Sequence, residues 1–167
     1  KPGTLEKWGL GWKDLCDKFP KLIYASASGF GQTGPLKELP AYDMVVQGMG
    51  GLMSVTGHPQ TEPTRVGTSI GDITAALFTT IGINSALYDR EKTGKGMFID
   101  VSMLDCQIAI LENAIARYLS KNEIPQPMGS RHPSIAPFEA FNTKDSYIII
   151  AAGNDKLFEK LCNALGM

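Results

Sequence analysis

The segment IGDITAALFTTIGINSALY (residues 70–88) decides the fold class, because it is the longest helical pattern in the chain. Apolar and small side chains recur along it at three- and four-residue spacings, as in a helix that buries one face. These side chains are Ile73, Ala76, Leu77, Thr80, Ile81, Asn84 and Tyr88. The segment EKTGKG (91–96) that follows is typical of a helix C-terminus, with basic residues in the last turn and glycine beyond it. We therefore predict a long helix from Ile70 to Tyr88.

Two β-rich segments lie on either side of this helix. LIYASAS (22–28) is bounded by Pro20 and Gly29, and MFIDVS (97–102) alternates in hydropathy, so both are predicted as strands. Helical patterns are also expected over 12–19, 42–53 and 104–119, with loops over 29–40 and 56–67. The order strand, helix, strand, helix indicates an α/β architecture.

The composition changes near residue 125. Three prolines and a glycine fall between Pro125 and Pro133, and Pro137 follows, which is typical of a semi-rigid linker. Beyond it we predict a strand over 147–152 and a helix over 155–165. One strand and one helix cannot enclose a core, so this part is expected to open a second domain. The predicted organisation is a large domain (1–124), a linker (125–137) and the start of a small domain (138–167).

Composition and charge limit the classes of function. The chain has 167 residues, of which 43% are hydrophobic and 18 are glycine, enough for a core and too apolar for a disordered chain. The formal net charge is −1, without the excess of positive charge that nucleic-acid backbones require. We therefore expect no nucleic-acid partner. The chain begins with Lys1 and ends just after a helical pattern, so we expect it to be an internal fragment of a longer protein.

Three cysteines lie far apart, at Cys16, Cys106 and Cys162. An odd number without a CxxC pair argues against a disulfide framework and against a structural zinc site. Uninterrupted apolar runs are shorter than the ~20 residues of a membrane span, and no signal-peptide pattern opens the chain. We expect a cytoplasmic protein, with an organelle matrix as the alternative, and no membrane or metal partner.

The string GFGQTG (29–34) matches the GxGxxG pattern of dinucleotide-binding proteins and follows a predicted strand. In that fingerprint the third glycine must open a helix, whose N-terminus faces the pyrophosphate. Here Gly34 is followed by Pro35 and a charged stretch that ends at Pro40. We therefore predict a structural turn, and a redox enzyme stays an alternative that nicotinamide or flavin binding would reveal.

Asp72 is the carboxylate that the sequence singles out, because it opens the longest helix. One interpretation is a capping box, with Ser69 as N-cap and Asp72 as the third helical residue. The other is a nucleophile, since a helix N-terminus favours the ionised carboxylate and the small neighbouring residues leave it accessible. The two interpretations are compatible.

Other polar residues carry weaker signals. Tyr42 opens a predicted helix, where an aromatic side chain belongs to the core or to a lid, or orients a ligand with its hydroxyl. Asp43 is interpreted as a helix cap. His58 is expected in a surface loop and His132 in the linker.

Several strings resemble the class III CoA-transferases, the family that includes the carnitine and bile-acid CoA-transferases and formyl-CoA transferase. They are Lys1–Gly3 with Gly9–Gly11, Leu22–Tyr24, Ser28–Pro35, Tyr42–Asp43, Gly50–Met53, Gly67–Asp72, Thr93–Gly96, Ile99–Asp105, and Pro137–Phe138 with Thr143–Asp145. The resemblance covers essentially the whole chain. It implies part of a Rossmann-like large domain and the start of a small domain, in a protein more than twice as long that forms an interlocked homodimer.

The resemblance also implies an activity. Asp72 would attack an acyl-CoA donor to form an acyl-aspartyl anhydride, and the CoA thiolate would return to form an aspartyl-CoA thioester for a carboxylic acid acceptor. The stretch Pro40, Ala41, Tyr42 and Asp43 would contact CoA and substrate, and Lys7 would contact a CoA phosphate. No metal, redox group or tightly bound cofactor is implied, CoA being a substrate.

Two other functions stay open. The α-methylacyl-CoA racemases share this fold and use the histidine of a Gly-His-Asp string, where this chain has Ala41-Tyr42-Asp43. The resemblance therefore favours transfer over racemisation. The second alternative is a non-catalytic CoA-binding or assembly protein, and the fragment alone is expected to be inactive.

Overall fold

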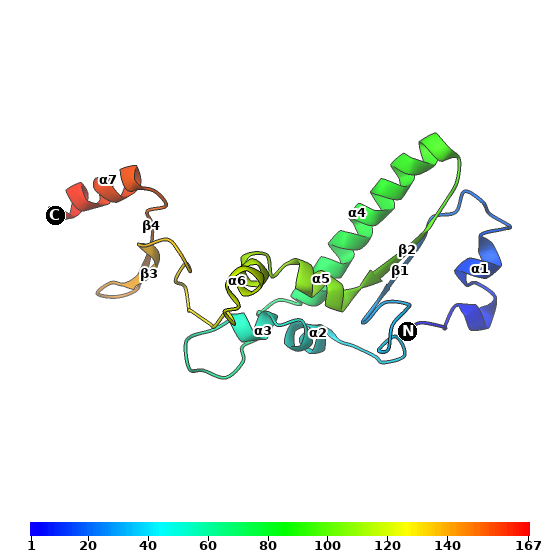
Figure 1. The fold of residues 1–167 in the computed structure, drawn as a ribbon, viewed down its shortest axis with the longest axis horizontal. Coiled ribbons are helices and arrows are strands. Elements are labelled where there is room, and N and C mark those ends of the chain that lie inside the picture. Colours follow the sequence, from blue (N-terminus) through cyan, green and yellow to red (C-terminus); the bar gives the residue numbers. More distant parts are fainter.

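The computed structural model describes all 167 residues, and the long predicted helix dominates it (Figure 1). The elements in chain order are η1 (Glu6–Trp8), α1 (Trp12–Leu15), β1 (Tyr24–Ser28), α2 (Asp43–Met49), α3 (Leu52–Val55), α4 (Ile70–Thr93), β2 (Phe98–Ser102), α5 (Met103–Ala109), α6 (Asn113–Lys121), β3 (Phe138–Asn142), β4 (Tyr147–Ala151) and α7 (Asp155–Leu165). Helix α4 extends five residues beyond the predicted end, to Thr93, and Gly94 follows in the left-handed conformation.

Strands β1 and β2 form a parallel pair with Tyr24 opposite Phe98 and Ser28 opposite Ser102. The crossover between them contains α2, α3 and α4, which confirms the predicted α/β architecture. Helix α4 packs along both strands and also contacts α2 and α5. Because parallel strands end at the same edge, the loop after β1 and the start of α5 lie side by side, joined by the Leu104 N–H to Gly29 carbonyl hydrogen bond of 3.1 Å.

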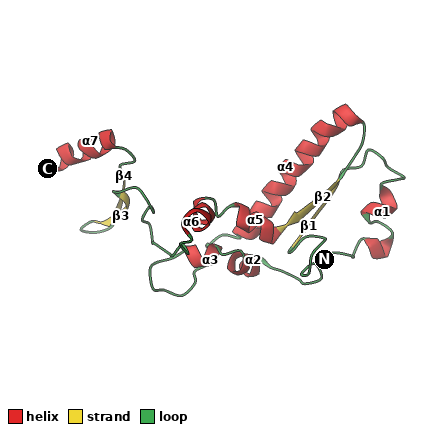
Figure 2. Cartoon of the chain, in the orientation of Figure 1, coloured by secondary structure: helices red, strands yellow, loops and turns green.

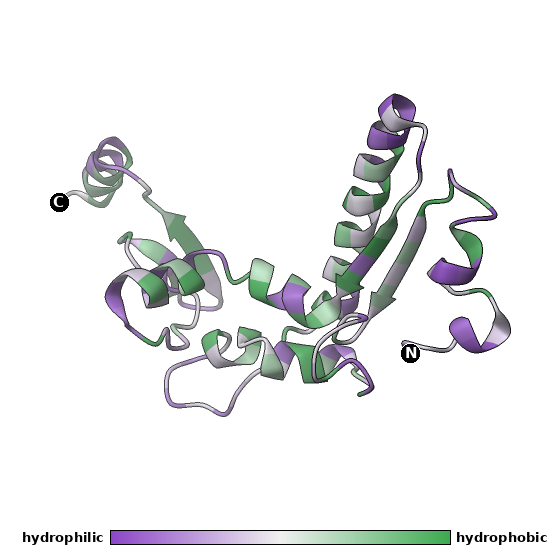
Figure 3. Cartoon of the chain, turned by 45° about the vertical axis from the view of Figure 1, so that its right-hand side comes forward, coloured by the Kyte–Doolittle hydropathy of each residue, from purple (hydrophilic) through white to green (hydrophobic).

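Helix α4 is also long and apolar enough to span a membrane, judged by length and composition alone. Its most apolar 18-residue window has a mean hydropathy of 1.3, and 22% of that window is buried. Core helices of water-soluble proteins meet the same criterion. The colouring of Figure 3 shows that the C-terminal end of α4 is hydrophilic, whereas one of the two strands beside it is largely hydrophobic and the other is near neutral.

Two predicted helices are each divided in two. The segment 42–53 forms α2 and α3, because Gly51 adopts φ +85°, a left-handed conformation that ends one helix and starts the next. The segment 104–119 forms α5 and α6, with Glu112 at φ +40° between them. The prediction of one helix was wrong here because no glycine or proline marks the second break. Tertiary packing places Leu111 against Gly51 at this point.

The C-terminal part has one strand more than predicted. Strand β3 pairs antiparallel with β4, from Phe138 opposite Ala151 to Asn142 opposite Tyr147, and α7 follows over the predicted residues. Between Lys121 and Phe138 the chain has no helix or strand, and Figure 2 shows this stretch as a long loop. The division into domains at 125–137 stays a prediction.

The buried core lies where α4, β2 and α5 meet. Ala75, Val101 and Cys106 form its centre, with Ile99 and Met103 packed against them. Only 14 of the 167 residues are buried. The core therefore anchors the first half of α4, whose first turn contains the candidate nucleophile.

Candidate active site

Asp72 lies in the first turn of α4, and its side chain is exposed to solvent. Ser69 is the N-cap residue, but its side chain accepts no hydrogen bond from the helix, so the predicted capping box is not formed. The helix start is capped instead by Asp43, which lies on the neighbouring helix α2. Its Oδ1 accepts a hydrogen bond of 2.8 Å from the N–H of Gly71, one of the donors that a helix start leaves without a partner.

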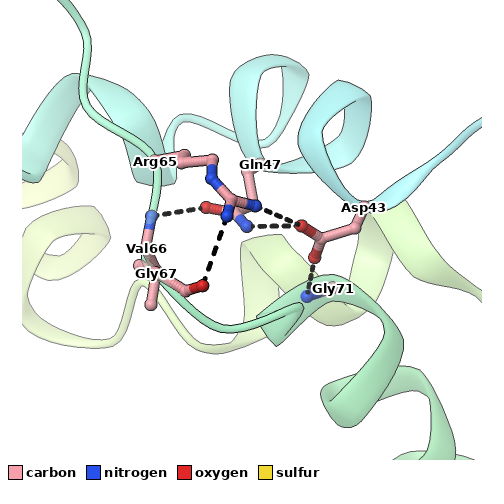
Figure 4. A network of polar contacts seen from close by, with 6 residues as sticks. All are labelled: Asp43, Gln47, Arg65, Val66, Gly67 and Gly71. Atoms are coloured by element: carbon pink, nitrogen blue, oxygen red, sulfur yellow. Dashed lines mark hydrogen bonds and ion pairs between the residues drawn. The ribbon is translucent and has the colours of Figure 1, made fainter.

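Asp43 is the first residue of α2, and its side chain is only 11% exposed (Figure 4). Its second oxygen, Oδ2, accepts a hydrogen bond of 2.8 Å from Nε2 of Gln47, one helical turn further along α2. Nη1 of Arg65 lies 4.0 Å from the same oxygen, which makes Arg65 and Asp43 the single ion pair within the chain. Both carboxylate oxygens of Asp43 are therefore bound to groups of the protein.

Gln47 continues the network toward the loop that leads into α4. Its side chain is fully buried, and Oε1 accepts a hydrogen bond of 2.8 Å from the N–H of Val66. Arg65 donates to the carbonyl of Gly67 at 3.3 Å, so its half-exposed side chain bridges the loop and Asp43 (Figure 4). The loop over 65–67 and the start of α4 are thus tied to a single face of α2.

A second set of contacts holds the same turn from the side of α5. The hydroxyl of Thr74 donates to the carbonyl of Ile70 at 2.8 Å and accepts from Nε2 of Gln107 at 2.9 Å. Gln107 is fully buried, and its Oε1 has no hydrogen-bond partner. The N-terminal turn of α4 is therefore fixed from two sides, while the Asp72 side chain faces solvent.

The other residues predicted to contact CoA are not all close to the first turn of α4. Tyr42 is the N-cap of α2, directly before Asp43, and its side chain is 79% exposed. Pro40 is exposed and Ala41 half-buried, in the loop before α2. Lys7 lies in η1, exposed and without an ion pair. The structure brings Tyr42, Asp43 and Asp72 to one corner between α2 and α4, whereas no contact joins Lys7 to that corner. Their contacts with CoA stay predictions.

The glycine string GFGQTG forms a turn, as predicted. The N–H of Gln32 donates to Oδ2 of Asp100 on β2 at 2.9 Å, and Nε2 of Gln32 donates to Ser26 on β1 at 2.8 Å. No helix begins between Gly34 and Asp43, so Gly34 does not open one. The loop therefore lacks the helix N-terminus that holds a dinucleotide pyrophosphate.

His132 and Cys106 are each held in a structural setting. Nδ1 of His132 accepts hydrogen bonds from the N–H groups of Ser134 and Ile135, which makes it a structural residue of its turn. Burial, with a smaller contribution from the charge of Asp105, raises the pKa of the Cys106 thiol above its ordinary value, so the unreactive thiol form predominates. Burial also raises the pKa of Tyr24, whose hydroxyl donates to the Leu10 carbonyl.

Five cavities, of about 200 to 660 Å³, lie away from this corner. The cavity of about 340 Å³ between α4, β2 and α5 is lined by Phe78, Ile99 and Cys106 among others, and that of about 320 Å³ lies between the N-terminal residues and β1. Asp72 lines none of the five. Its carboxylate is exposed to solvent and so accessible to an incoming electrophile.

Sequence reasoning missed Gln47, Arg65 and Gln107. Gln47 had a usable signal, because it lies four residues after Asp43 and hence on the same helix face. Arg65 and Gln107 had none, since their partners lie 22 and 33 residues away in sequence. These contacts become visible only when α2, α4 and α5 are packed together.

The chain matches a protein family and several curated proteins over its whole length. The model of the family described as "CoA-transferase family III" matches residues 1–167. The chain is 48% identical to acetyl-CoA:oxalate CoA-transferase of Acetobacter aceti over 167 residues, which is 99% of this chain and 43% of that protein. It is 42% identical to succinate–glutarate CoA-transferase of Agrobacterium fabrum, with 100% of this chain and 42% of that protein covered.

Solved structures of related proteins have the same fold as this chain. A CAIB/BAIF family protein from Brucella suis superposes with a TM-score of 0.86 at 45% identity, over 98% of this chain and 43% of that one. Rv3272 from M. tuberculosis superposes with a TM-score of 0.83 at 30% identity, over 99% of this chain and 43% of that one. The chain thus spans less than half the length of the relatives that it matches.

Proposed function

This chain belongs to CoA-transferase family III, and on that premise we propose that the protein containing it moves CoA from an acyl-CoA donor to a free carboxylic acid. The relatives are CoA-transferases named for acyl-CoA and carboxylate substrates. Their names specify oxalate, glutarate, succinyl, D-citramalate and mesaconate groups. We propose a short dicarboxylic acid as one of the two acids here.

Asp72 acts as the nucleophile in this proposal. One of its oxygens attacks the thioester carbon of the donor, the carbon–sulfur bond breaks, and CoA leaves as the thiolate. The product is a mixed anhydride between the donor acid and Asp72. The support is positional, because this carboxylate is exposed in the first turn of a 24-residue helix, where the positive end of the helix dipole can stabilise a negative charge.

The remaining steps exchange one acyl bond for another. The thiolate attacks the Asp72 carbonyl carbon of the anhydride, releasing the donor acid and leaving an aspartyl-CoA thioester. The acceptor carboxylate attacks this thioester to give a second anhydride and the thiolate, which then attacks the acceptor's acyl carbon. Acceptor-CoA leaves and Asp72 is restored. No step consumes an oxidant or a reductant, so the chemistry needs no redox cofactor.

The neighbouring residues are proposed to hold the CoA ester. Tyr42, Ala41 and Pro40 lie beside the α2–α4 corner, and the phenol of Tyr42 is free to contact a ligand. Asp43 completes the matched stretch, but both of its oxygens already accept hydrogen bonds from the protein, so its contribution is proposed to run through the first turn of α4. Lys7 is proposed to pair with a CoA phosphate, a task that suits an ammonium on a flexible stem. We also propose an interlocked homodimer for the full-length protein.

The experiment that tests this function traps the covalent intermediate. The full-length protein is incubated with succinyl-CoA and hydroxylamine, which converts an aspartyl anhydride or thioester into an aspartyl hydroxamate. Peptide mass spectrometry is expected to find this hydroxamate on Asp72. Asp72→Asn is expected to abolish labelling and to lower kcat by more than about 10⁴-fold, since the nucleophile is lost.

Asp89→Asn is the matched control, a carboxylate near the other end of the same helix. It is expected to keep both labelling and turnover. A hydroxamate on another carboxylate, or turnover that survives Asp72→Asn, would contradict the assignment of the nucleophile. Binding of succinyl-CoA without any labelling or transfer would favour the non-catalytic alternative instead.

Racemisation requires groups that CoA transfer does not, because a proton donor and a proton acceptor must face opposite sides of the α-carbon. The position before Asp43 is Tyr42, and His132 is occupied within its own turn. Exchange of the substrate's α-proton in D₂O distinguishes the two reactions. We expect none during transfer, whereas exchange at the rate of turnover would favour a racemase.

A further inference from the structure

We propose that Asp43 and Gln47 form a directional hydrogen-bond bridge that positions Asp72, so that Asp43 is a positioning residue of the transfer reaction. The bridge consists of the Val66 N–H, the Gln47 side chain, the Asp43 side chain and the Gly71 N–H. It joins the loop before α4 to the first turn of α4 by way of α2 (Figure 4). The inference rests on the proposed function of Asp72 as nucleophile.

Both ends of the bridge are backbone N–H groups, which can only donate. At one end the Val66 N–H requires an acceptor, so Gln47 must present Oε1 there and Nε2 toward Asp43. At the other end the Gly71 N–H also requires an acceptor. Asp43 therefore faces a donor on each side. Only a side chain with two acceptor oxygens satisfies both, and an ionised carboxylate is such a group.

An asparagine at position 43 breaks the bridge even though it has nearly the same shape. Its oxygen can accept from the Gly71 N–H, but its NH₂ group then faces Nε2 of Gln47, donor against donor. Turning the Gln47 amide moves the conflict to the Val66 N–H. Because Gln47 is fully buried and the Asp43 side chain is 11% exposed, water has little access to relieve the mismatch.

The link to catalysis is the peptide that the bridge holds. Gly71 directly precedes Asp72, and its N–H is fixed by Asp43 because Ser69 supplies no side-chain cap. The Asp72 side chain is exposed and has no ion pair of its own. Its direction therefore depends on the backbone of the first turn. A shift of about 1 Å in a reacting group can lower a rate by about 100-fold.

The test uses the full-length protein and a double variant in which the carboxylate and the amide of positions 43 and 47 are exchanged. In Asp43→Asn with Gln47→Glu, the glutamate offers two acceptors, one to the Val66 N–H and one to the asparagine NH₂. The asparagine oxygen still accepts from the Gly71 N–H. The double variant thus restores the three hydrogen bonds of the bridge with the carboxylate and the amide exchanged, and it conserves net charge. The ion pair of Arg65 with position 43 is lost in Asp43→Asn and in the double variant alike, so comparing these two variants isolates the bridge. Each single variant leaves one link mismatched.

Three quantities are measured for wild type, both single variants and the double variant. They are kcat, KM for succinyl-CoA, and hydrogen–deuterium exchange of the peptide that contains Gly71. Asp43→Asn is expected to lower kcat by about 10–100-fold, with KM changed less than about twofold. Exchange near Gly71 is expected to become faster, with β2 and α5 unchanged. The double variant is expected to recover most of the lost kcat and the slow exchange.

Asp89→Asn is again the matched control and is expected to change none of the three quantities. The proposal is overturned if Asp43→Asn lowers kcat while exchange near Gly71 stays at the wild-type rate, because Asp43 would then act by touching the substrate. It is equally overturned if a folded double variant is no more active than Asp43→Asn. Where the double variant does not fold, the exchange rate in Asp43→Asn decides alone.

Failure of the proposed function gives a separate result. Wild-type protein without transfer activity and without hydroxamate on Asp72 contradicts the nucleophile, whatever the variants do. Exchange at Gly71 is measured without substrate, so it reports on the bridge independently of turnover.

Discussion

At the scale of single residues, position 71 shows how tightly α2 and α4 meet. A Cβ atom added to Gly71 would lie 2.7 Å from Cγ2 of Val46 and 3.0 Å from Oδ1 of Asp43. Val46 is fully buried, so a shift of its side chain would have to displace neighbouring protein atoms. Only a hydrogen atom fits at this position, and this closeness lets the Asp43 carboxylate reach the Gly71 N–H.

We predict that Gly71→Ala lowers the free energy of unfolding of the full-length protein by about 1–3 kcal/mol, as for other overpacked sites. It is also expected to lower kcat, because the methyl group pushes Asp43 away from the first turn of α4. Chemical denaturation and steady-state kinetics measure the two effects. Gly67→Ala is the control, since a Cβ there meets no atom within 4 Å. Equal stability of the two variants would contradict the proposed close approach.

At the scale of elements, the break between α5 and α6 is the feature that the sequence pattern conceals. Ser102 caps α5 by accepting from the N–H of Asp105, and α5 ends at Ala109. Glu112 then adopts φ +40° and ψ −105°, which is unfavourable for a residue with a side chain. The pairing of α4 with α5 and the contact of Leu111 with Gly51 hold the chain in this path.

We predict that Glu112→Gly raises the free energy of unfolding by about 1 kcal/mol, because glycine adopts this conformation without strain. Denaturant titration of the full-length protein measures the change. Asn122→Gly is the matched control at the end of α6, where φ is +56°. Asparagine tolerates this left-handed conformation, so a change of only a few tenths of a kcal/mol is expected. A stability loss in Glu112→Gly would show that the break carries no strain.

At the scale of the whole molecule, the solvent-accessible surface area is larger than that of a typical folded monomer of this mass. The chain exposes 11625 Å², whereas a folded monomer of 18.0 kDa is expected to expose about 8,000 Å². The excess is of the order of an obligate protein–protein interface. Many large apolar side chains lie in this surface, among them Leu77, Ile81 and Tyr88 on α4. The elements therefore rely on contacts beyond these 167 residues.

We predict that the polypeptide 1–167, expressed alone, does not unfold cooperatively and binds an apolar dye such as ANS. The reason is that 14 buried residues cannot offset the entropy of ordering the chain. Calorimetry and dye fluorescence measure both properties. The full-length protein serves as the control, with a sharp transition and little dye binding. A sharp transition in the 167-residue polypeptide would contradict the prediction.

Sequence alone determined the α/β order of elements and the position of the candidate nucleophile. Local patterns suffice for this, because the helical spacing of residues 70–88 and the strands on either side are set by which side chains are buried. The strings around Asp72 also pointed to the family. Strand β3 was missed, since the short segment Phe138–Asn142 is recognisable only through its pairing with β4.

Only the tertiary structure decided which groups bind the first turn of α4. The sequence predicted a local cap from Ser69, but the Gly71 N–H is bound by Asp43, 28 residues away in the chain. The deciding fact is the packing of α2 against α4, which brings Asp43 within hydrogen-bond distance and buries Gln47 behind it. Spacing along the chain can show that a helix start needs an acceptor, but it cannot show which distant side chain provides one.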